Sequence, residues 1–172
     1  MNDNQIVDSS FKAIINAPIE RVDIPQWCFN LSEREYQGCS PAHVAAGFTT
    51  TPDGKRMSIN VEIIGGSLMV QHYVETLGRK DHPILESTSD VFTPNGRTTI
   101  RVTWELSVKE IAPGKCELTN RVETHATDEL VTLLEGRAFR SNSSELSASR
   151  SQLLITRARR RCLPRASSAQ RC

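Results

Sequence analysis

The feature that most constrains the fold of this chain is the alternation of apolar and polar residues along two neighbouring segments. In TTIRVTWELSVKEI, residues 98–111, every second residue from Ile100 to Val108 is apolar, and polar or charged residues stand between them. KCELTNRVETHA, residues 115–126, continues with the same period. A period of two is typical of a β-strand with one buried face. With the turn sequence Ala-Pro-Gly between them, the two segments are predicted to form a long antiparallel hairpin.

The register of this hairpin follows from the length of its loop. A three-residue loop of Ala-Pro-Gly would place Ile111 opposite Lys115. Three cross-strand pairs are then predicted: Trp104–Val122, Leu106–Asn120 and Glu105–Arg121. A cross-strand pair of opposite charge contributes up to about 1 kcal/mol. We therefore interpret Glu105 and Arg121 as an exposed structural pair.

Five more segments are predicted as strands. They are residues 9–16, 43–50, 56–64, 67–77 and 83–92. Gly65 and Gly66 can adopt the positive φ of a tight hairpin turn. The motifs TPDGK and TPNGR supply Pro followed by Asp-Gly or Asn-Gly, which is also hairpin chemistry. The sequence therefore predicts seven antiparallel strands.

Short helices are predicted between the first two strands. Pro18 and Pro25 divide that segment, and Ser32 with Glu35 forms a capping box that begins a helix. Two short helices fit there.

A longer helix is predicted after residue 126. Thr127 or Asp128 serves as its N-cap, and one apolar stripe follows: Leu130, Val131, Leu134 and Ala138. Gly136 and the run SNSS interrupt its second part.

Length and composition indicate one globular domain. The chain has 172 residues, 38% hydrophobic and 24% charged. Its apolar runs are far shorter than the roughly 20 residues that cross a bilayer, so no membrane span is expected. The start, MNDNQIVDSS, lacks the basic and apolar regions of a secretory leader. We predict a cytoplasmic protein. The five cysteines include no CxxC pair, so no zinc knuckle is indicated, and we expect neither a metal nor a cofactor.

Charge divides the chain near residue 145. Residues 1–145 hold 14 Lys and Arg against 20 Asp and Glu, a net charge of −6, whereas the remainder holds seven arginines and no acid. We predict one domain over residues 9–145 and a basic, disordered tail over residues 146–172. The tail lacks interleaved aromatic residues and a recognition motif, so no nucleic-acid partner is expected. A dispensable extension and an altered reading frame would both account for its composition.

The predicted order is one strand, two short helices, six antiparallel strands and a C-terminal helix. This order resembles the SRPBCC superfamily, the helix-grip domains that include START lipid-binding domains, pollen allergens and polyketide cyclase/dehydrase-like proteins. INAPIERV, residues 15–22, looks like the family's junction between first strand and first helix. The resemblance implies an α+β helix-grip fold: a curved seven-stranded antiparallel sheet wrapped around a long C-terminal helix. The extra Pro and CSPAH turn in the connecting segment and the interrupted last helix depart from the family's pattern.

The resemblance also implies a cavity between sheet and C-terminal helix that holds a small hydrophobic or aromatic molecule. Six residues are predicted to bind that ligand: Tyr36, His72, Asp90, Trp104, Asn120 and Thr124. By strand alternation His72 shares one face with Leu68, Val70 and Val74, and we predict that this face looks inward. The orientation of the Asp90 side chain depends on the length of the turn that follows its strand. A two-residue loop directs it outward, and a three-residue loop directs it inward.

Two functions fit such a cavity. The first is a binding or carrier protein. The alternative is a cyclase, dehydratase or hydratase acting on a polyketide-like or other apolar carbonyl substrate. There, His72 would be the catalytic general acid or base, because imidazole titrates near about 6.5. Asn120 or Tyr36 would hold the substrate oxygen.

Other features of the sequence do not point to a single function. A regulatory role for the basic tail is a third class of function, and a monomer and a homodimer both stay open. Cys39 and His43 in CSPAH are spaced four apart, as in a metal or thiol–imidazole pair, but Pro41 disfavours helical spacing and no further ligand cluster appears.

Overall fold

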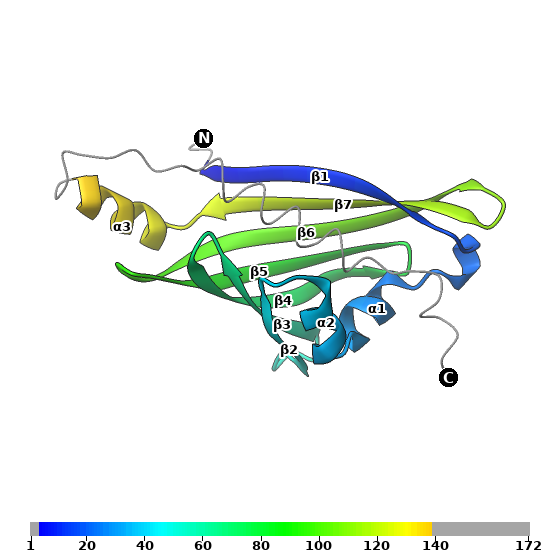
Figure 1. Cartoon of the computed structure of the whole chain (residues 1–172), viewed down its shortest axis with the longest axis horizontal. Coiled ribbons are helices and arrows are strands. Elements are labelled where there is room, and N and C mark those ends of the chain that lie inside the picture. Colours follow the sequence, from blue (N-terminus) through cyan, green and yellow to red (C-terminus); the bar gives the residue numbers. More distant parts are fainter. Residues whose placement is uncertain (1–3, 139–172) are drawn as a thin grey trace.

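A seven-stranded antiparallel sheet forms the body of the protein (Figure 1). The computed structural model describes residues 4–138. The strands lie in the order β1-β7-β6-β5-β4-β3-β2. Their bounds are β1 Gln5–Ile15, β2 His43–Thr50, β3 Arg56–Ile64, β4 Ser67–Arg79, β5 His82–Thr93, β6 Gly96–Ala112 and β7 Lys115–Ala126. All seven strands agree with the predicted segments to within a few residues.

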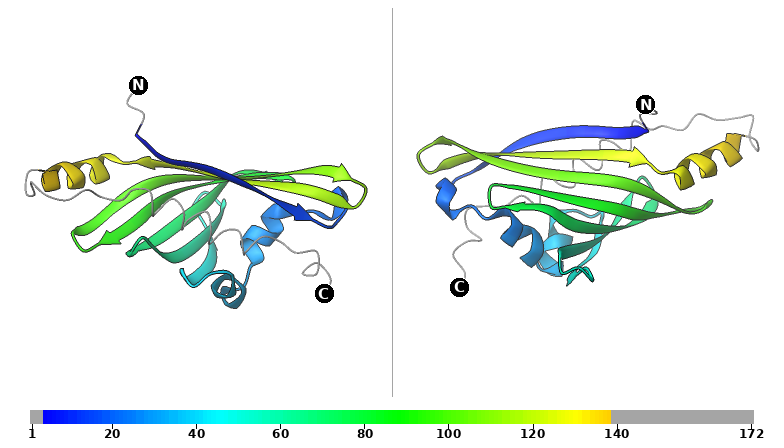
Figure 2. Two further views of the ribbon diagram at one scale, coloured as in Figure 1. Left: turned by 45° about the horizontal axis from the view of Figure 1, so that its top comes forward. Right: turned by 180° about the vertical axis from the view of Figure 1, so that it is seen from behind.

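Short helices cover one end of the sheet, all on the same side of it (Figure 2). They are the 3-10 turn η1 Ile19–Arg21, α1 Ile24–Asn30 and α2 Glu33–Cys39. Helix α3, Asp128–Ala138, follows β7 and lies at the opposite end of the sheet (Figure 1). The predicted α+β helix-grip class, with a curved sheet, two short early helices and a C-terminal helix, is confirmed. The predicted tail, residues 146–172, lies outside the described residues.

Side-chain caps begin the helices where the sequence predicts them. Ser32 Oγ accepts the backbone N–H of Glu35, and the Glu35 carboxylate accepts the backbone N–H and the hydroxyl of Ser32. These hydrogen bonds to the ionised form hold the pKa of Glu35 below its usual range. Thr127 Oγ1 accepts the backbone N–H of Leu130 at 3.3 Å, so Thr127 caps α3.

The register of the β6–β7 hairpin is the predicted one. Trp104 pairs with Val122, Leu106 with Asn120, and Glu105 with Arg121. The loop itself differs from our prediction, because Ala112 and not Ile111 pairs with Lys115. A bulge between Glu110 and Ala112 absorbs the extra residue, so a two-residue loop and the predicted register are compatible.

The β5–β6 turn settles the orientation of Asp90. Thr93 pairs with Gly96, which leaves a two-residue loop, and Gly96 takes a φ of 121°. Asp90 consequently pairs with Thr99 and points to the convex face.

The closed apolar core lies between α1 and strands β5, β6 and β7. Its buried residues are Ile15, Val22, Ile24, Cys28, Phe29, Tyr73, Leu85, Val102, Trp104, Leu106, Val108, Cys116, Leu118 and Val122. Burial raises the pKa of the Cys116 thiol, which is therefore kept protonated.

Strands β3 and β4 turn their polar residues inward. The buried residues of these strands are Ser58, Asn60, Glu62, Ile64, Met69, Gln71 and Tyr73. Ile63 and Leu68, on the opposite face, are 52% and 39% exposed. The predicted inward face of β4 is therefore wrong. Alternation showed which residues of β4 share a face. We took the apolar face as the inner one, but in the structure that face points outward.

Candidate ligand-binding pocket

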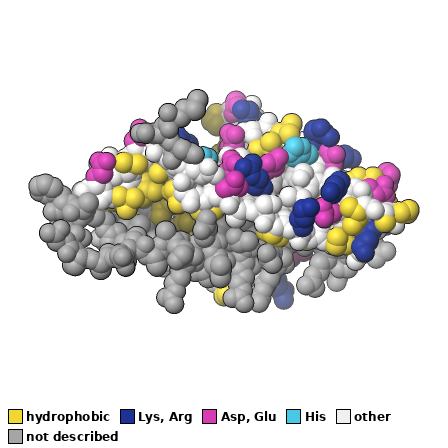
Figure 3. All heavy atoms as spheres, turned by 90° about the horizontal axis from the view of Figure 1, so that it is seen from above, with side chains coloured by type: hydrophobic (Ala, Val, Ile, Leu, Met, Phe, Trp, Pro, Cys, Tyr) yellow, Lys and Arg dark blue, Asp and Glu magenta, His cyan; other side chains and the backbone are white. Residues whose placement is uncertain are grey.

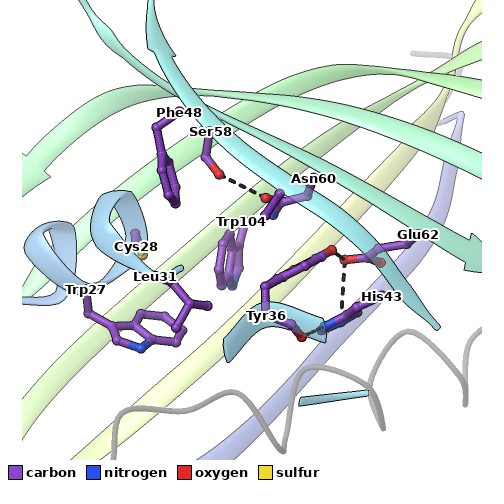
Figure 4. Close-up of a pocket in the computed structure, with 11 residues that line it drawn as sticks. Trp27, Cys28, Leu31, Tyr36, His43, Phe48, Ser58, Asn60, Glu62 and Trp104 are labelled. Carbon is purple, nitrogen blue, oxygen red and sulfur yellow. Dashed lines mark hydrogen bonds and ion pairs between the residues drawn. The ribbon is translucent and has the colours of Figure 1, made fainter. Parts of the chain in front are cut away.

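An open pocket lies between the two short helices and the inner face of the sheet (Figure 4). The hollow is not closed: the space between protein atoms there is about 480 Å³, and this figure includes open solvent. Eleven residues line it: Trp27, Cys28, Leu31, Tyr36, His43, Ala46, Phe48, Ser58, Asn60, Glu62 and Trp104. They come from α1, α2, β2, β3 and β6 and the turn after α1, so the pocket depends on segments far apart in sequence.

One side of the pocket is aromatic. The rings of Trp27 and Trp104 meet edge to face, with centroids 6.4 Å apart and an interplanar angle of 73°. Behind Trp104, Tyr73 packs at 5.5 Å, and Asn120 Oδ1 accepts the indole N–H at 3.2 Å. Trp104 is thus held rigidly as a flat wall, because both packing and a hydrogen bond orient it.

The other side carries a buried polar cluster, the Tyr36–His43–Glu62 cluster. The Tyr36 hydroxyl donates to Glu62 Oε1 at 2.6 Å, and the Tyr36 and His43 rings stack with centroids 4.0 Å apart. His43 Nδ1 lies 2.7 Å from the Tyr36 carbonyl oxygen, and His43 Nε2 lies 3.7 Å from Glu62 Oε1. All three residues are buried. A carboxylate, an imidazole and a phenol therefore share one corner of an aromatic pocket.

Local structure explains why these three residues meet. The Ser32–Glu35 capping box begins α2 and so places Tyr36 on its first full turn. A bond from the His43 backbone N–H to the Ser40 carbonyl, 3.1 Å, closes the turn into β2. The β2–β3 register then pairs His43 with Glu62.

A second polar pair lies beside the cluster on β3. Ser58 Oγ donates to Asn60 Oδ1 at 2.9 Å. Ser58, Asn60 and Glu62 are alternate residues of one strand, so their side chains form a polar row along the pocket floor (Figure 4).

Four of the six predicted site residues face the inside of the sheet. Tyr36 and Trp104 line the pocket, and Asn120 supports Trp104 from behind. Thr124 is buried on the inner face of β7 but does not line the pocket.

The other two predicted site residues lie on the convex face. His72 stands between the buried residues Gln71 and Tyr73 and pairs with Ile59, so its side chain points away from the pocket. The inward orientation that we predicted for His72 is wrong. Asp90 accepts a hydrogen bond from Arg97 Nε at 2.8 Å on the same convex face.

Sequence reasoning missed His43 and Glu62. It considered His43 only together with Cys39 and set that pair aside, whereas His43 Nδ1 contacts the Tyr36 carbonyl. It did not consider Glu62 as a site residue. The available signal was the polar row Ser58, Asn60 and Glu62, which an inward-facing interpretation of β3 would have identified as a pocket floor.

Within residues 4–138 no cluster of three metal-ligating side chains occurs. No helix in this range is long and apolar enough to cross a membrane.

Comparison with known proteins gives the fold. No family model matches the chain, and no curated protein matches it. A START superfamily protein from Mycobacterium smegmatis is 14% identical with a TM-score of 0.51, over 77% of this chain and 97% of that one. A conserved protein from Geobacillus kaustophilus is 11% identical with a TM-score of 0.53, over 95% of both chains. A protein from Thermus thermophilus is 13% identical with a TM-score of 0.52, over 96% of this chain and 100% of that one. The chain has the START-like helix-grip fold.

Proposed function

We propose that the protein binds a small molecule with a flat, apolar or aromatic body in the pocket of Figure 4. The observation that carries this proposal is the pairing of an aromatic wall with an open mouth. Trp27, Trp104 and Phe48 present ring surface to a space that the described residues leave open. Binding sites for small molecules are typically concave and apolar, with a few polar groups that orient the ligand. The Tyr36–His43–Glu62 cluster supplies those groups.

Phe48 offers a test that leaves the core intact. Its side chain lines the pocket mouth and is 40% exposed, whereas Phe92 is 42% exposed on the convex face. Phe48→Ala should weaken binding of an aromatic probe such as 3-methylindole by about tenfold, which corresponds to about 1.4 kcal/mol. Phe92→Ala is the matched control and should leave the affinity unchanged. Isothermal titration calorimetry measures both, and equal effects of the two variants would argue against this pocket.

Mass spectrometry of the purified protein under native conditions gives an independent test. A bound molecule should add its mass to wild type and be reduced in Phe48→Ala. If wild type carries no added mass, and an aromatic and apolar compound panel causes no thermal shift, the proposal fails.

A second candidate function is general acid/base catalysis on an apolar carbonyl substrate. Glu62 favours it, because a buried carboxylate held by the Tyr36 hydroxyl lines the same pocket as the aromatic wall. Glu62 would take the role first assigned to His72 and accept a proton from the carbon beside the carbonyl. Deuterium exchange into 2-tetralone in D₂O, followed by NMR, tests this. Exchange should be faster with wild type than with Glu62→Gln, and equal rates would exclude Glu62 as the base.

A further inference from the structure

The charges of the eleven residues that line the pocket are unbalanced. Glu62 is the only acid among the eleven lining residues, and none of them is Lys or Arg. No Lys or Arg of the described chain lies within ion-pair distance of Glu62. Among residues 4–138, the basic side chain that approaches it is His43.

The short contact of His43 is to the Tyr36 backbone and not to Glu62. The carbonyl oxygen of Tyr36 can only accept a hydrogen bond, so His43 Nδ1, 2.7 Å away, is the nitrogen that donates. In a neutral ring, Nε2 then carries the lone pair. Nε2 lies 3.7 Å from Glu62 Oε1, which is longer than a hydrogen bond.

Glu62 is nevertheless deeply buried, at 3% exposure. Its Oε1 accepts one hydrogen bond from the Tyr36 hydroxyl, and Oε2 accepts none within the described residues. Burying a carboxylate with so little compensation is costly. A cation that enters the pocket would recover part of that cost, since the Coulomb attraction is stronger where water is excluded.

The aromatic wall suits the same kind of ligand. The rings of Trp27, Trp104 and Phe48 attract a cation through their π faces and pack against a flat ring. A short chain that ends in an ammonium group would allow both contacts at once.

We propose that the pocket selects aromatic amines in their protonated form, with Glu62 as the counter-charge. This inference rests on the proposed binding function and names the ligand class of the same site. The ammonium N–H donates to Glu62 Oε2, and the aromatic body lies against Trp104 and Phe48.

Three indoles that differ mainly in charge test the inference. Isothermal titration calorimetry of the full chain at pH 7 compares tryptamine, 3-methylindole and indole-3-propionate. Tryptamine should bind at least tenfold more tightly than 3-methylindole, and indole-3-propionate should bind most weakly. Glu62→Gln keeps an acceptor for the Tyr36 hydroxyl but removes the charge, so the preference for tryptamine should disappear. Glu86→Gln, an exposed position on the convex side of β5, is the control and should keep the preference.

The possible results separate this inference from the proposed function. Equal affinities for tryptamine and 3-methylindole, or a preference that survives in Glu62→Gln, would overturn the amine selectivity. Binding of 3-methylindole that Phe48→Ala weakens would still support an aromatic pocket. Should Glu62→Gln fail to fold, the wild-type series decides alone. If none of the three indoles binds, the amine inference is overturned, and the co-purification experiment judges the proposed function separately.

Discussion

The two halves of the sheet share the same alternation but differ in how polar their inner faces are. In β6 and β7, apolar side chains such as Leu106 and Leu118 are fully buried, while Arg121 and Glu123 look outward. In β3 and β4, Asn60 and Gln71 are buried, and apolar side chains look outward. One half is built as a conventional half-buried sheet. The other half mixes polar and apolar residues on its inner face, where Met69 and Tyr73 are also buried.

The difference follows what each inner face meets. The inner face of β6 and β7 packs into the closed core beneath α1, where unpaired polar groups would be costly. The inner face of β3 borders the pocket, where polar groups can bond to one another or to a ligand. A strand that lines a binding site therefore need not carry its apolar residues on the inner face.

Two leucines test the contrast most strongly. Leu106→Ala removes a side chain with 0% exposure in β6 and should cost about 2–5 kcal/mol of unfolding free energy. Leu68→Ala makes the same change on the convex face of β4 and should cost less than about 1 kcal/mol. Urea denaturation measures both. Equal losses would mean that the convex face of β4 is covered in solution, which would break the comparison.

Buried amides give an intermediate effect. Gln71 is 2% exposed, and its Oε1 has no hydrogen-bond partner within the described chain. Gln71→Met keeps the size of the side chain and removes that oxygen, so it should stabilise the fold by about 1 kcal/mol. Asn120 Nδ2 in the other half likewise has no hydrogen-bond partner within the described chain, but Asn120→Leu also removes the acceptor of the Trp104 indole N–H and should destabilise the fold by about 1 kcal/mol.

Urea denaturation measures the change in unfolding free energy of both variants. Changes of opposite sign would support the contrast between the two halves of the sheet. A loss of stability in Gln71→Met would instead show that Oε1 makes a bond in solution, for example to water.

The charged convex face gives the smallest effect. Acidic and basic side chains lie beside one another on the face seen in Figure 3. Arg121 Nη2 lies 3.0 Å from Asp8 Oδ2, and Arg121 also pairs with Glu105 and Glu123. Exposed ion pairs are worth less than about 1 kcal/mol, so Arg121→Gln should change stability by no more than that. The difference should shrink in high salt because mobile ions screen exposed charges.

The acid limb of the stability curve gives a second readout of Arg121. Its hydrogen bond holds the pKa of Asp8 below the ordinary value of 3.8. The stabilisation by Asp8 is therefore fully present above that value and is lost as the pH falls through the lower pKa of the folded state. Thermal melts of wild type and Arg121→Gln should converge at the acid end of the series. A difference that persists below that pKa would assign the effect of Arg121 to packing.

The candidate site could be predicted only in part. Trp104 followed from the β6 alternation, where apolar residues do face the core. Tyr36 followed from the capping box, which marks the start of α2. His72 was misplaced because the apolar neighbours that it shares a face with lie on the convex side of β4. Glu62 was missed for the same reason, because the alternating apolar residues of the neighbouring strand, β3, also lie on the outer face.

Local chemistry determined the elements of this protein. Strand period, turn residues and helix caps act within a few residues, so seven strands, the helix starts and the β6–β7 register could be read from the chain alone. Which face of each strand looks inward depends on what packs against it, and that involves segments far apart in sequence. Only the tertiary structure joined α2, β2 and β3 into the Tyr36–His43–Glu62 cluster. Because this cluster lies next to Trp104, the residues at this edge of the sheet form a candidate binding pocket.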